Sequence, residues 1–268
     1  DEDEEEEGCH VARLLSGSAS GQSAASSDCS VGVRRPQPLL RHVLAPLRRP
    51  SSCSEDELSA AMAFLGALVA TPVPEPTDVA IAAGAARALR EVLTCPSVTA
   101  SLRRAAAGVL ASAAAHVLGK QACGLLEEPG LWEALCHTAE TAGAKKLRHE
   151  CLRAVASIAK HGDVTLRKLD CHRLLRLVVV ALADSPATSV LWGLLEAAEA
   201  CLLGEQRTEL AEEAERSGLL GFLPKLLADL PPSSEVRRKA SRILQACSEK
   251  GPLSHDEQPM AWAQAGGA

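Results

Sequence analysis

Hydrophobic residues in the second half of the chain recur at helical spacing in three similar segments. The segments begin at Leu147 (LRHECLRAVASIA), Val190 (VLWGLLEAAEACL) and Val236 (VRRKASRILQACS). In each, a small or apolar residue lies four and again eight positions after the start, along one face of a helix. The starts are 43 and 46 residues apart, within the period of roughly 40 to 47 residues of stacked helical repeats. The pattern predicts an all-α solenoid.

Polar and proline-containing breaks divide the chain into further helices. We expect helices over residues 54–70, 78–93 and 98–118, followed by three sets of one short, one medium and one long helix. The sets cover residues 120–127, 131–141 and 144–160, then 164–169, 172–183 and 187–203, then 206–215, 219–230 and 234–249. Glycines fall at or near the joints, where helix ends often need a positive φ. They are Gly130, Gly143, Gly162, Gly204 and Gly218.

Residues 1–53 have a different composition, with an acidic run, a Ser/Gly/Ala stretch and an Arg/Pro segment from Arg34. Low hydrophobicity cannot offset the entropic cost of folding, so we expect a disordered tail there. The ordered repeat domain is then residues 54–250, with a flexible tail over 251–268. The Arg/Pro segment is interpreted as a solvated linker, with a docking peptide, a nuclear localisation signal or an internal partner for the acidic run as alternatives.

Composition supports helices and argues against nucleic acid. Hydrophobic residues make up 47% of the chain but aromatic residues only 2%, and Ala and Leu dominate, as suits closely packed helices. The net charge of −6 comes from the seven acids of Asp1–Glu7, which leave 27 acidic against 28 basic residues elsewhere. A strong basic excess is therefore missing. No apolar run reaches the roughly 18 to 20 residues that a membrane helix needs, so we expect a soluble protein.

The ten cysteines are interpreted as reduced thiols packed among apolar residues, in an intracellular protein. The pairs Cys136-His137 and Cys171-His172, and Cys151 near His149, place possible metal ligands close together. However, no CxxC pair occurs, and adjacent helical residues point about 100° apart. We therefore expect no metal site and no cofactor.

The last unit, GLLGFLPKLLADLPPSSEVRRKASRILQACSEKG from Gly218, carries the pattern of a known repeat. A Gly, an apolar-Pro-x-apolar-apolar run, a loop, Glu-Val and Ala-x-x-x-Leu follow one another, which resembles the armadillo repeat. The unit from Gly130 matches nearly as well, whereas the unit from Cys171 lacks the glycine and the Glu-Val. The resemblance implies a right-handed superhelix of about four three-helix repeats. The HEAT repeat, which has the same period, remains the alternative.

The resemblance also implies a concave groove lined by the third helices, in which partner peptides bind. Its residues would stand three, six and ten positions after Leu102, Leu147, Val190 and Val236. The candidate partner-binding residues are Glu150, Arg153, Ser157, Glu196, Lys239 and Arg242. The other groove positions hold Ala105, Gly108, Ser112, Gly193, Ala200 and Ala246. The alternative interpretation is that these charges form a solvated helix face, with Glu150 paired to Arg153.

Trp192 is off the centre of this surface by the same count, so we expect it to pack against a neighbouring helix. Importin-like members place Trp and Asn at the sixth and tenth positions, and this chain contains no Asn. An importin-type peptide ladder is therefore excluded in that form.

The function expected is a non-catalytic scaffold or adaptor that binds a peptide or helix of a partner protein in the groove. The main alternative is an armadillo-type nucleotide-exchange factor that embraces a heat-shock chaperone. Weaker alternatives are an RNA-binding solenoid and a HEAT-repeat enzyme, since His149-Glu150 is a single His-Glu dyad and no phosphate-binding or nucleophile motif occurs. We expect a cytoplasmic protein that could also enter the nucleus.

Overall fold

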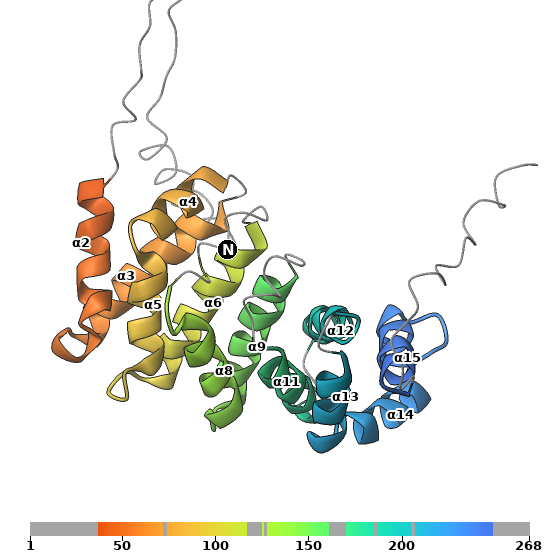
Figure 1. The fold of residues 1–268 in the computed structure, drawn as a ribbon. Helices are drawn as coiled ribbons and strands as arrows, with labels where there is room; N and C mark the ends of the chain where they lie inside the picture. The colour runs from red at the N-terminus through yellow and green to blue at the C-terminus, as the bar shows by residue number, and fades with distance from the viewer. Residues whose placement is uncertain are drawn as a thin grey trace, which may run out of the picture.

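The computed structural model describes residues 37–71, 74–116, 125, 128–160, 170–184, 187–204 and 207–248. Over these ranges the chain forms helices and no strand, arranged as an elongated array that runs from α2 to α15 (Figure 1). The helices are α2 (Gln37–Arg48), α3 (Glu55–Ala70), α4 (Pro74–Ala82), α5 (Ala85–Thr94), α6 (Ala100–His116), α8 (Leu131–Thr141), α9 (Lys145–Ala159), α11 (Cys171–Asp184), α12 (Thr188–Leu202), α13 (Arg207–Arg216), α14 (Leu219–Asp229) and α15 (Glu235–Ser248). A 3₁₀ turn, Pro50–Ser52, links α2 to α3.

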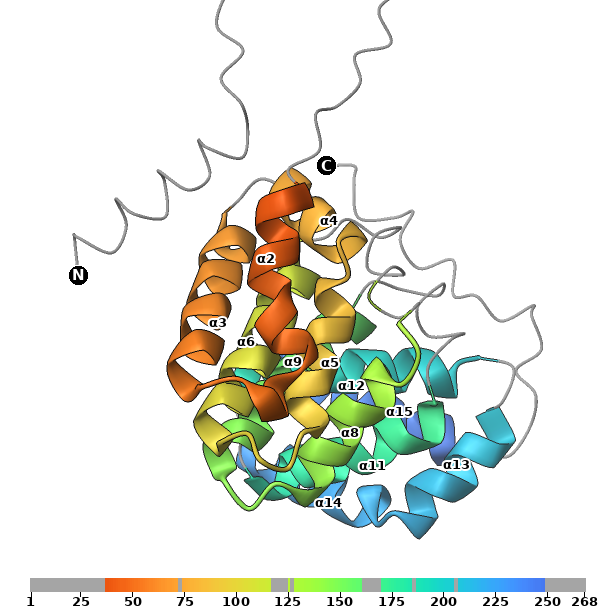
Figure 2. The ribbon, with the colours of Figure 1, turned by 90° about the vertical axis from the view of Figure 1, so that its left-hand side faces the viewer.

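The helices pack in two parallel rows. Helices α3, α6, α9, α12 and α15 contact one another in sequence, and we call this row the third-helix ladder. Helices α2, α5, α8, α11 and α14 form a second row, and adjacent members of the two rows pair into layers. Figure 2 looks along the array from its N-terminal end, with α2 and α3 nearest the viewer. The all-α solenoid is confirmed, and it contains five such layers within the described residues.

The fifth layer corrects the predicted tail. Residues 37–53, assigned above to the disordered segment, form α2 and the 3₁₀ turn. Leu40, Leu44 and Leu47 are almost completely buried, because their spacing places them on one face of α2 against α3 and α5. Overall composition concealed this short amphipathic pattern. Residues 1–36 and 251–268, the remainder of the two predicted tails, lie outside the described residues.

Glycines in the left-handed region mark the starts of three second-row helices. Gly84 (φ 91°), Gly130 (φ 78°) and Gly218 (φ 82°) precede α5, α8 and α14. A residue with a Cβ would be strained there. The single helix predicted over 78–93 is therefore wrong: it divides at Gly84 into α4 and α5, and α4 begins at Pro74 rather than after Asp78.

The layer of α11 has no such glycine and uses a side chain instead. The Asp170 carboxylate accepts a hydrogen bond from the Arg173 backbone N–H at 3.0 Å, which satisfies a donor at the start of α11. Gly143 and Gly204, also predicted at joints, have no positive φ. Gly162 and most of the predicted short helices 120–127 and 164–169 lie outside the described residues.

Small residues allow the third-helix ladder to pack closely. The buried face of α6 is mostly alanine, including Ala106, Ala107 and Ala111. At the contact of α9 with α12, a Cβ on Gly193 would lie 3.3 Å from the Ala156 Cβ, closer than most such contacts. Side-chain size at the contact sets the distance between helix axes, so these residues fix the spacing of the ladder.

Arginines also join consecutive layers. Arg48 at the end of α2 donates a hydrogen bond to the Ala83 carbonyl at 2.8 Å, and Arg90 of α5 donates to the Pro129 carbonyl. In both cases the carbonyl belongs to the residue before a left-handed glycine. Each arginine therefore holds the turn that begins the next second-row helix.

Candidate functional site

A shallow groove of about 400 Å³ lies between α3 and α6 on the third-helix ladder. Its lining is mostly small and uncharged, and Arg153 of α9 is the one ionisable side chain in it. The lining residues are Ser59, Met62, Ala63, Gly66, Ser101, Leu102, Ala105, Gly108, Val109, Ser112 and Arg153. The groove positions predicted at Ala105, Gly108, Ser112 and Arg153 therefore lie together around one depression.

Glu150 and Arg153 of α9 form an ion pair beside this groove. The Arg153 Nε and Nη2 atoms each lie 2.8 Å from Glu150 Oε2. A Cβ on Gly108 would lie 3.6 Å from Arg153 Nη2 and 3.8 Å from Glu150 Oε2, so the pair lies over the glycine of α6. This is the pairing named in the alternative interpretation, in which the two charges belong to a solvated helix face.

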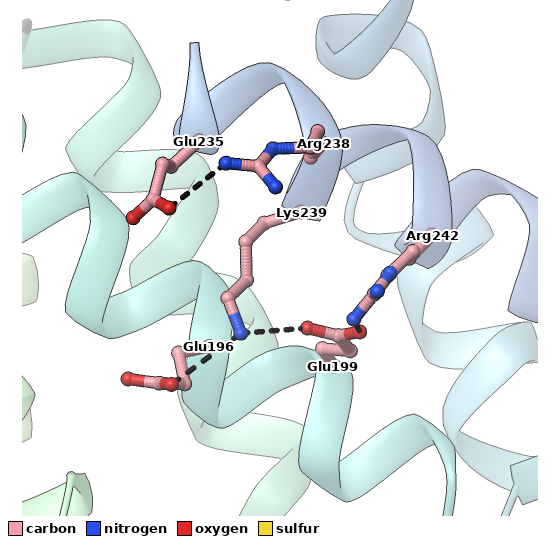
Figure 3. Close-up of polar contacts among 6 residues, drawn as sticks. All are labelled: Glu196, Glu199, Glu235, Arg238, Lys239 and Arg242. Atoms are coloured by element: carbon pink, nitrogen blue, oxygen red, sulfur yellow. Dashed lines mark hydrogen bonds and ion pairs between the residues drawn. The ribbon is translucent and has the colours of Figure 1, made fainter. Parts of the chain in front are cut away.

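A second group of charges, which we call the ion-pair cluster, joins α12 to α15 (Figure 3). It consists of Glu196, Glu199, Lys239 and Arg242. Lys239 Nζ lies 3.4 Å from Glu196 Oε1 and 3.0 Å from Glu199 Oε2. Arg242 Nη1 lies 3.2 Å from Glu199 Oε1. One buried carboxylate, that of Glu199, therefore holds two cations of the next layer.

In the two arginine pairs the acid is less exposed than the base, whereas in the Glu196–Lys239 pair the acid is more exposed, at 34% against 19%. Side-chain exposure is 69% for Arg242 and 44% for Arg153, but only 8% for Glu199 and 32% for Glu150. The carboxylates lie deeper than the guanidinium groups that they bind. Both guanidinium groups keep donors toward solvent, since an arginine carries five N–H donors.

Trp192 of α12 lies between cations of the two neighbouring layers. Lys160 Nζ is 5.6 Å and Lys239 Nζ is 5.4 Å from the centroid of its ring, within the range of a cation–π contact. Its indole N–H is buried and has no hydrogen-bond partner in the described part of the chain. The expectation that Trp192 packs against neighbouring residues is confirmed.

The structure separates the remaining predicted positions. Ser157 and Ala200 are half-buried, whereas Gly193 packs directly against α9 and Ala246 is 5% exposed. The prediction that Gly193 faces the groove is wrong, because α9 approaches it at Ala156. Ala246 is buried and so does not present an open groove surface either. Fewer positions of the third-helix ladder are therefore open to a partner than the count from each repeat start predicts.

Sequence reasoning missed the contribution of α3 and the residue at the centre of the ion-pair cluster. The spacing of Ser59, Ala63 and Gly66 repeats that of Ser101, Ala105 and Gly108, a signal that would have extended the array toward the N-terminus. Glu199 lies nine positions after Val190, outside the counted groove positions. An acid among the apolar residues of α12 was the available sign that it needed a cationic partner.

In the described part of the chain, the free thiols include Cys53, Cys95, Cys136, Cys151, Cys201 and Cys247. Cys136, Cys151 and Cys201 are buried, as predicted, and Cys171 and Cys247 are half-buried. Burial raises the pKa of the Cys151 thiol to about 12. Within the described ranges, no group of three or more His, Cys, Asp or Glu side chains is arranged to hold a metal ion. In the same ranges, no helix combines the length and hydrophobicity of a membrane span.

Comparisons with known proteins give structural likenesses only. No family model and no curated protein matches the chain. A designed armadillo repeat protein solved in complex with the peptide (KR)4 has a TM-score of 0.57 at 22% identity, covering 78% of this chain and 81% of the other. A second designed armadillo repeat protein has a TM-score of 0.57 at 20% identity, covering 89% and 98%.

An engineered protein solved by a structural genomics consortium has a TM-score of 0.60 at 20% identity, covering 91% of this chain and 89% of the other. The two rows of helices, the left-handed glycines between layers and these structural neighbours all point to the same fold. The chain has the fold of an armadillo-like helical-repeat protein.

Proposed function

We propose that this protein is a non-catalytic scaffold that binds an extended segment of a partner protein along the third-helix ladder. The proposal rests on one observation: a groove, an ion pair and an ion-pair cluster lie on successive helices of that row. The groove between α3 and α6, in which Arg153 is the one ionisable lining residue, comes first. The Glu150–Arg153 pair follows on α9, and the ion-pair cluster follows on α12 and α15. Solenoids use such extended surfaces for binding.

The dimensions suit an extended chain. Packed helices lie about 8 to 10 Å apart, and an extended chain advances about 3.3 Å per residue. Each step of the ladder therefore corresponds to two or three residues of a guest. A guest that reached from the groove to Arg242 would cross α9 and α12. The depression that Ala105 lines would leave room for a side chain of the guest.

The charges favour acidic side chains in the guest. Glu150 and Glu199 are engaged and lie deeper than their partners, whereas Arg153 and Arg242 remain 44% and 69% exposed. A carboxylate of the guest can accept hydrogen bonds from either arginine without breaking the existing pair, and such charge-assisted bonds are the stronger class. This differs from the designed armadillo protein whose peptide is (KR)4.

A direct test is fluorescence anisotropy with two labelled peptides, one of alternating Glu and Ala and one of alternating Lys and Ala. We expect the full chain to bind the Glu peptide at least about tenfold more tightly, since one charge-assisted hydrogen bond contributes about 1.5 kcal/mol or more. Higher salt should weaken this binding. Equal binding of both peptides, or preference for the Lys peptide, would contradict the proposed guest.

A further inference from the structure

Two cysteines from the paired helices α11 and α12 face each other at close range. Cys171 is the first residue of α11, and Cys201 lies in the last turn of α12. They are 30 positions apart in sequence, yet the Cys201 thiol donates a hydrogen bond to Cys171 Sγ at 3.0 Å. A disulfide has an S–S distance of about 2.05 Å, so a movement of about 1 Å separates this contact from a covalent bond.

The two thiols differ in burial and in pKa. Thiol exchange needs one accessible thiol that attacks first and a second thiol that then closes the disulfide. Cys201 is buried in the core, whereas Cys171 is half-buried at its edge. The hydrogen bond from Cys201 lowers the pKa of the Cys171 thiol, and the same bond, together with burial, raises the pKa of the Cys201 thiol. The thiolate therefore forms on the more accessible sulfur, and a thiolate is the nucleophile in exchange reactions.

We propose that Cys171 and Cys201 form a redox-active dithiol that small-molecule disulfides, such as oxidised glutathione, convert into an intramolecular disulfide. The Cys171 thiolate attacks one sulfur of glutathione disulfide, whose S–S bond breaks and releases one glutathione thiol carrying the proton that Cys171 lost. Cys201 then attacks Cys171 Sγ, and its proton leaves with the second glutathione. Two protein thiols are oxidised, and one glutathione disulfide is reduced to two thiols.

The new bond would tie the start of α11 to the end of α12. Glu199 of the ion-pair cluster lies two positions before Cys201, so the bond would hold the segment that carries this cluster. A cross-link restricts the unfolded chain, and the oxidised protein should therefore melt at a higher temperature. This inference does not depend on the proposed function, because its test involves no partner peptide.

The test equilibrates the reduced full chain with glutathione buffers of increasing oxidised fraction, blocks free thiols with iodoacetamide and maps tryptic peptides by mass. Trypsin places Cys171 in the peptide 169–173 and Cys201 in the peptide 177–207. We expect these two peptides to become linked, with the loss of two hydrogen atoms. The peptide 91–103 is the matched internal control. It contains half-buried Cys95, whose Sγ lies 3.1 Å from the Ser97 hydroxyl rather than from a thiol.

Cys201→Ser should stop the reaction at a mixed disulfide between Cys171 and glutathione, which would identify Cys171 as the attacking residue. The wild-type map does not depend on how well this variant folds. Three outcomes would overturn the proposal: both cysteines fully alkylated in the most oxidising buffer, a stable glutathione adduct on wild-type Cys171, or an adduct on the Cys95 peptide before the 171–201 link forms.

Discussion

The carboxylate of Glu199 and the ammonium group of Lys239 lie 3.0 Å apart, from Oε2 to Nζ, and join the last two helices of the third-helix ladder (Figure 3). The other oxygen of this carboxylate, Oε1, lies 3.2 Å from Arg242 Nη1. A single acid of α12 therefore aligns two side chains of α15. The cluster therefore connects two layers, and it also orients the exposed side chain of Arg242.

Replacing Glu199 with Gln should lower the free energy of unfolding by about 1 to 2 kcal/mol, because a buried charge-assisted contact is lost. The cost stays below that of breaking a fully buried pair, since Arg242 can turn into solvent. Urea unfolding measures the difference. The matched control is Glu235→Gln, which removes an exposed pair with Arg238 and should change stability by less than about 0.5 kcal/mol. Equal effects of the two substitutions would contradict the role given to Glu199.

Leu44→Ala should destabilise the protein by about 2 to 5 kcal/mol, because it leaves a cavity where α2 packs on the next layer. Leu44 is completely buried, whereas Leu39 of the same helix is 48% exposed. Leu39→Ala is therefore a control with the same chemistry, and its effect should stay within about 0.5 kcal/mol. Thermal unfolding of the two variants compares them. If both melted like the wild type, α2 would not be part of the folded array.

Gly193→Ala should be less favourable than Gly221→Ala by about 1 kcal/mol or more. Both changes add helix propensity, worth up to about 1 kcal/mol, but only the Cβ at position 193 meets a neighbour, at 3.3 Å from Ala156. Nothing lies within 4 Å of a Cβ at Gly221. Adding Ala156→Gly to Gly193→Ala should remove part of the penalty, as a double-mutant cycle would measure. Equal stability of the two single variants would show that the ladder is not tightly packed at this contact.

The start of α3 should make stability depend on pH. Ser54 donates its backbone N–H to Glu57 Oε2 at 2.8 Å, and this bond lowers the pKa of Glu57 from 4.5. Since the pKa is lower in the folded than in the unfolded chain, the carboxylate stabilises the fold above the unfolded value. This contribution is lost as the pH falls through the folded value.

Melting temperatures measured from neutral to acidic pH should therefore fall less steeply for Glu57→Gln than for the wild type. The variant should already be less stable at neutral pH, because the capping box around Ser54 loses its charged member. If the two proteins lost stability in parallel as the pH fell, the ionised form of Glu57 would not support the cap.

Much of the fold could be predicted because the same spacing of apolar residues recurs from one repeat to the next. The helices that begin with the segments at Leu147, Val190 and Val236 end within two residues of their predicted ends. The prediction was wrong where local composition and local spacing disagree. The Arg/Pro segment has the composition of a linker but the leucine spacing of a helix, and the spacing determined the structure of residues 37–48.

The candidate surface was predicted less completely, for a physical reason. Counting positions along a helix gives the direction in which a side chain points, but not how closely the neighbouring helix approaches. Gly193 points toward α9 and is covered by Ala156. Glu199 lies next to the counted positions and reaches the cations of α15. Both contacts depend on the distance between neighbouring layers, and the sequence of a single repeat does not determine that distance.

The central claim is that exposed guanidinium groups on the third-helix ladder hold an acidic guest. The most direct measurement compares Arg242→Gln with Arg216→Gln in their binding to the labelled Glu-Ala peptide. Arg216 of α13 has 66% side-chain exposure and pairs with a carboxylate that is 8% exposed, against 69% and 8% for Arg242 and its partner. The two arginines therefore match in environment and differ in being on or off the ladder. Arg242→Gln should weaken binding about tenfold or more, while Arg216→Gln leaves the affinity unchanged. Equal affinities of both variants and the wild type would contradict the account.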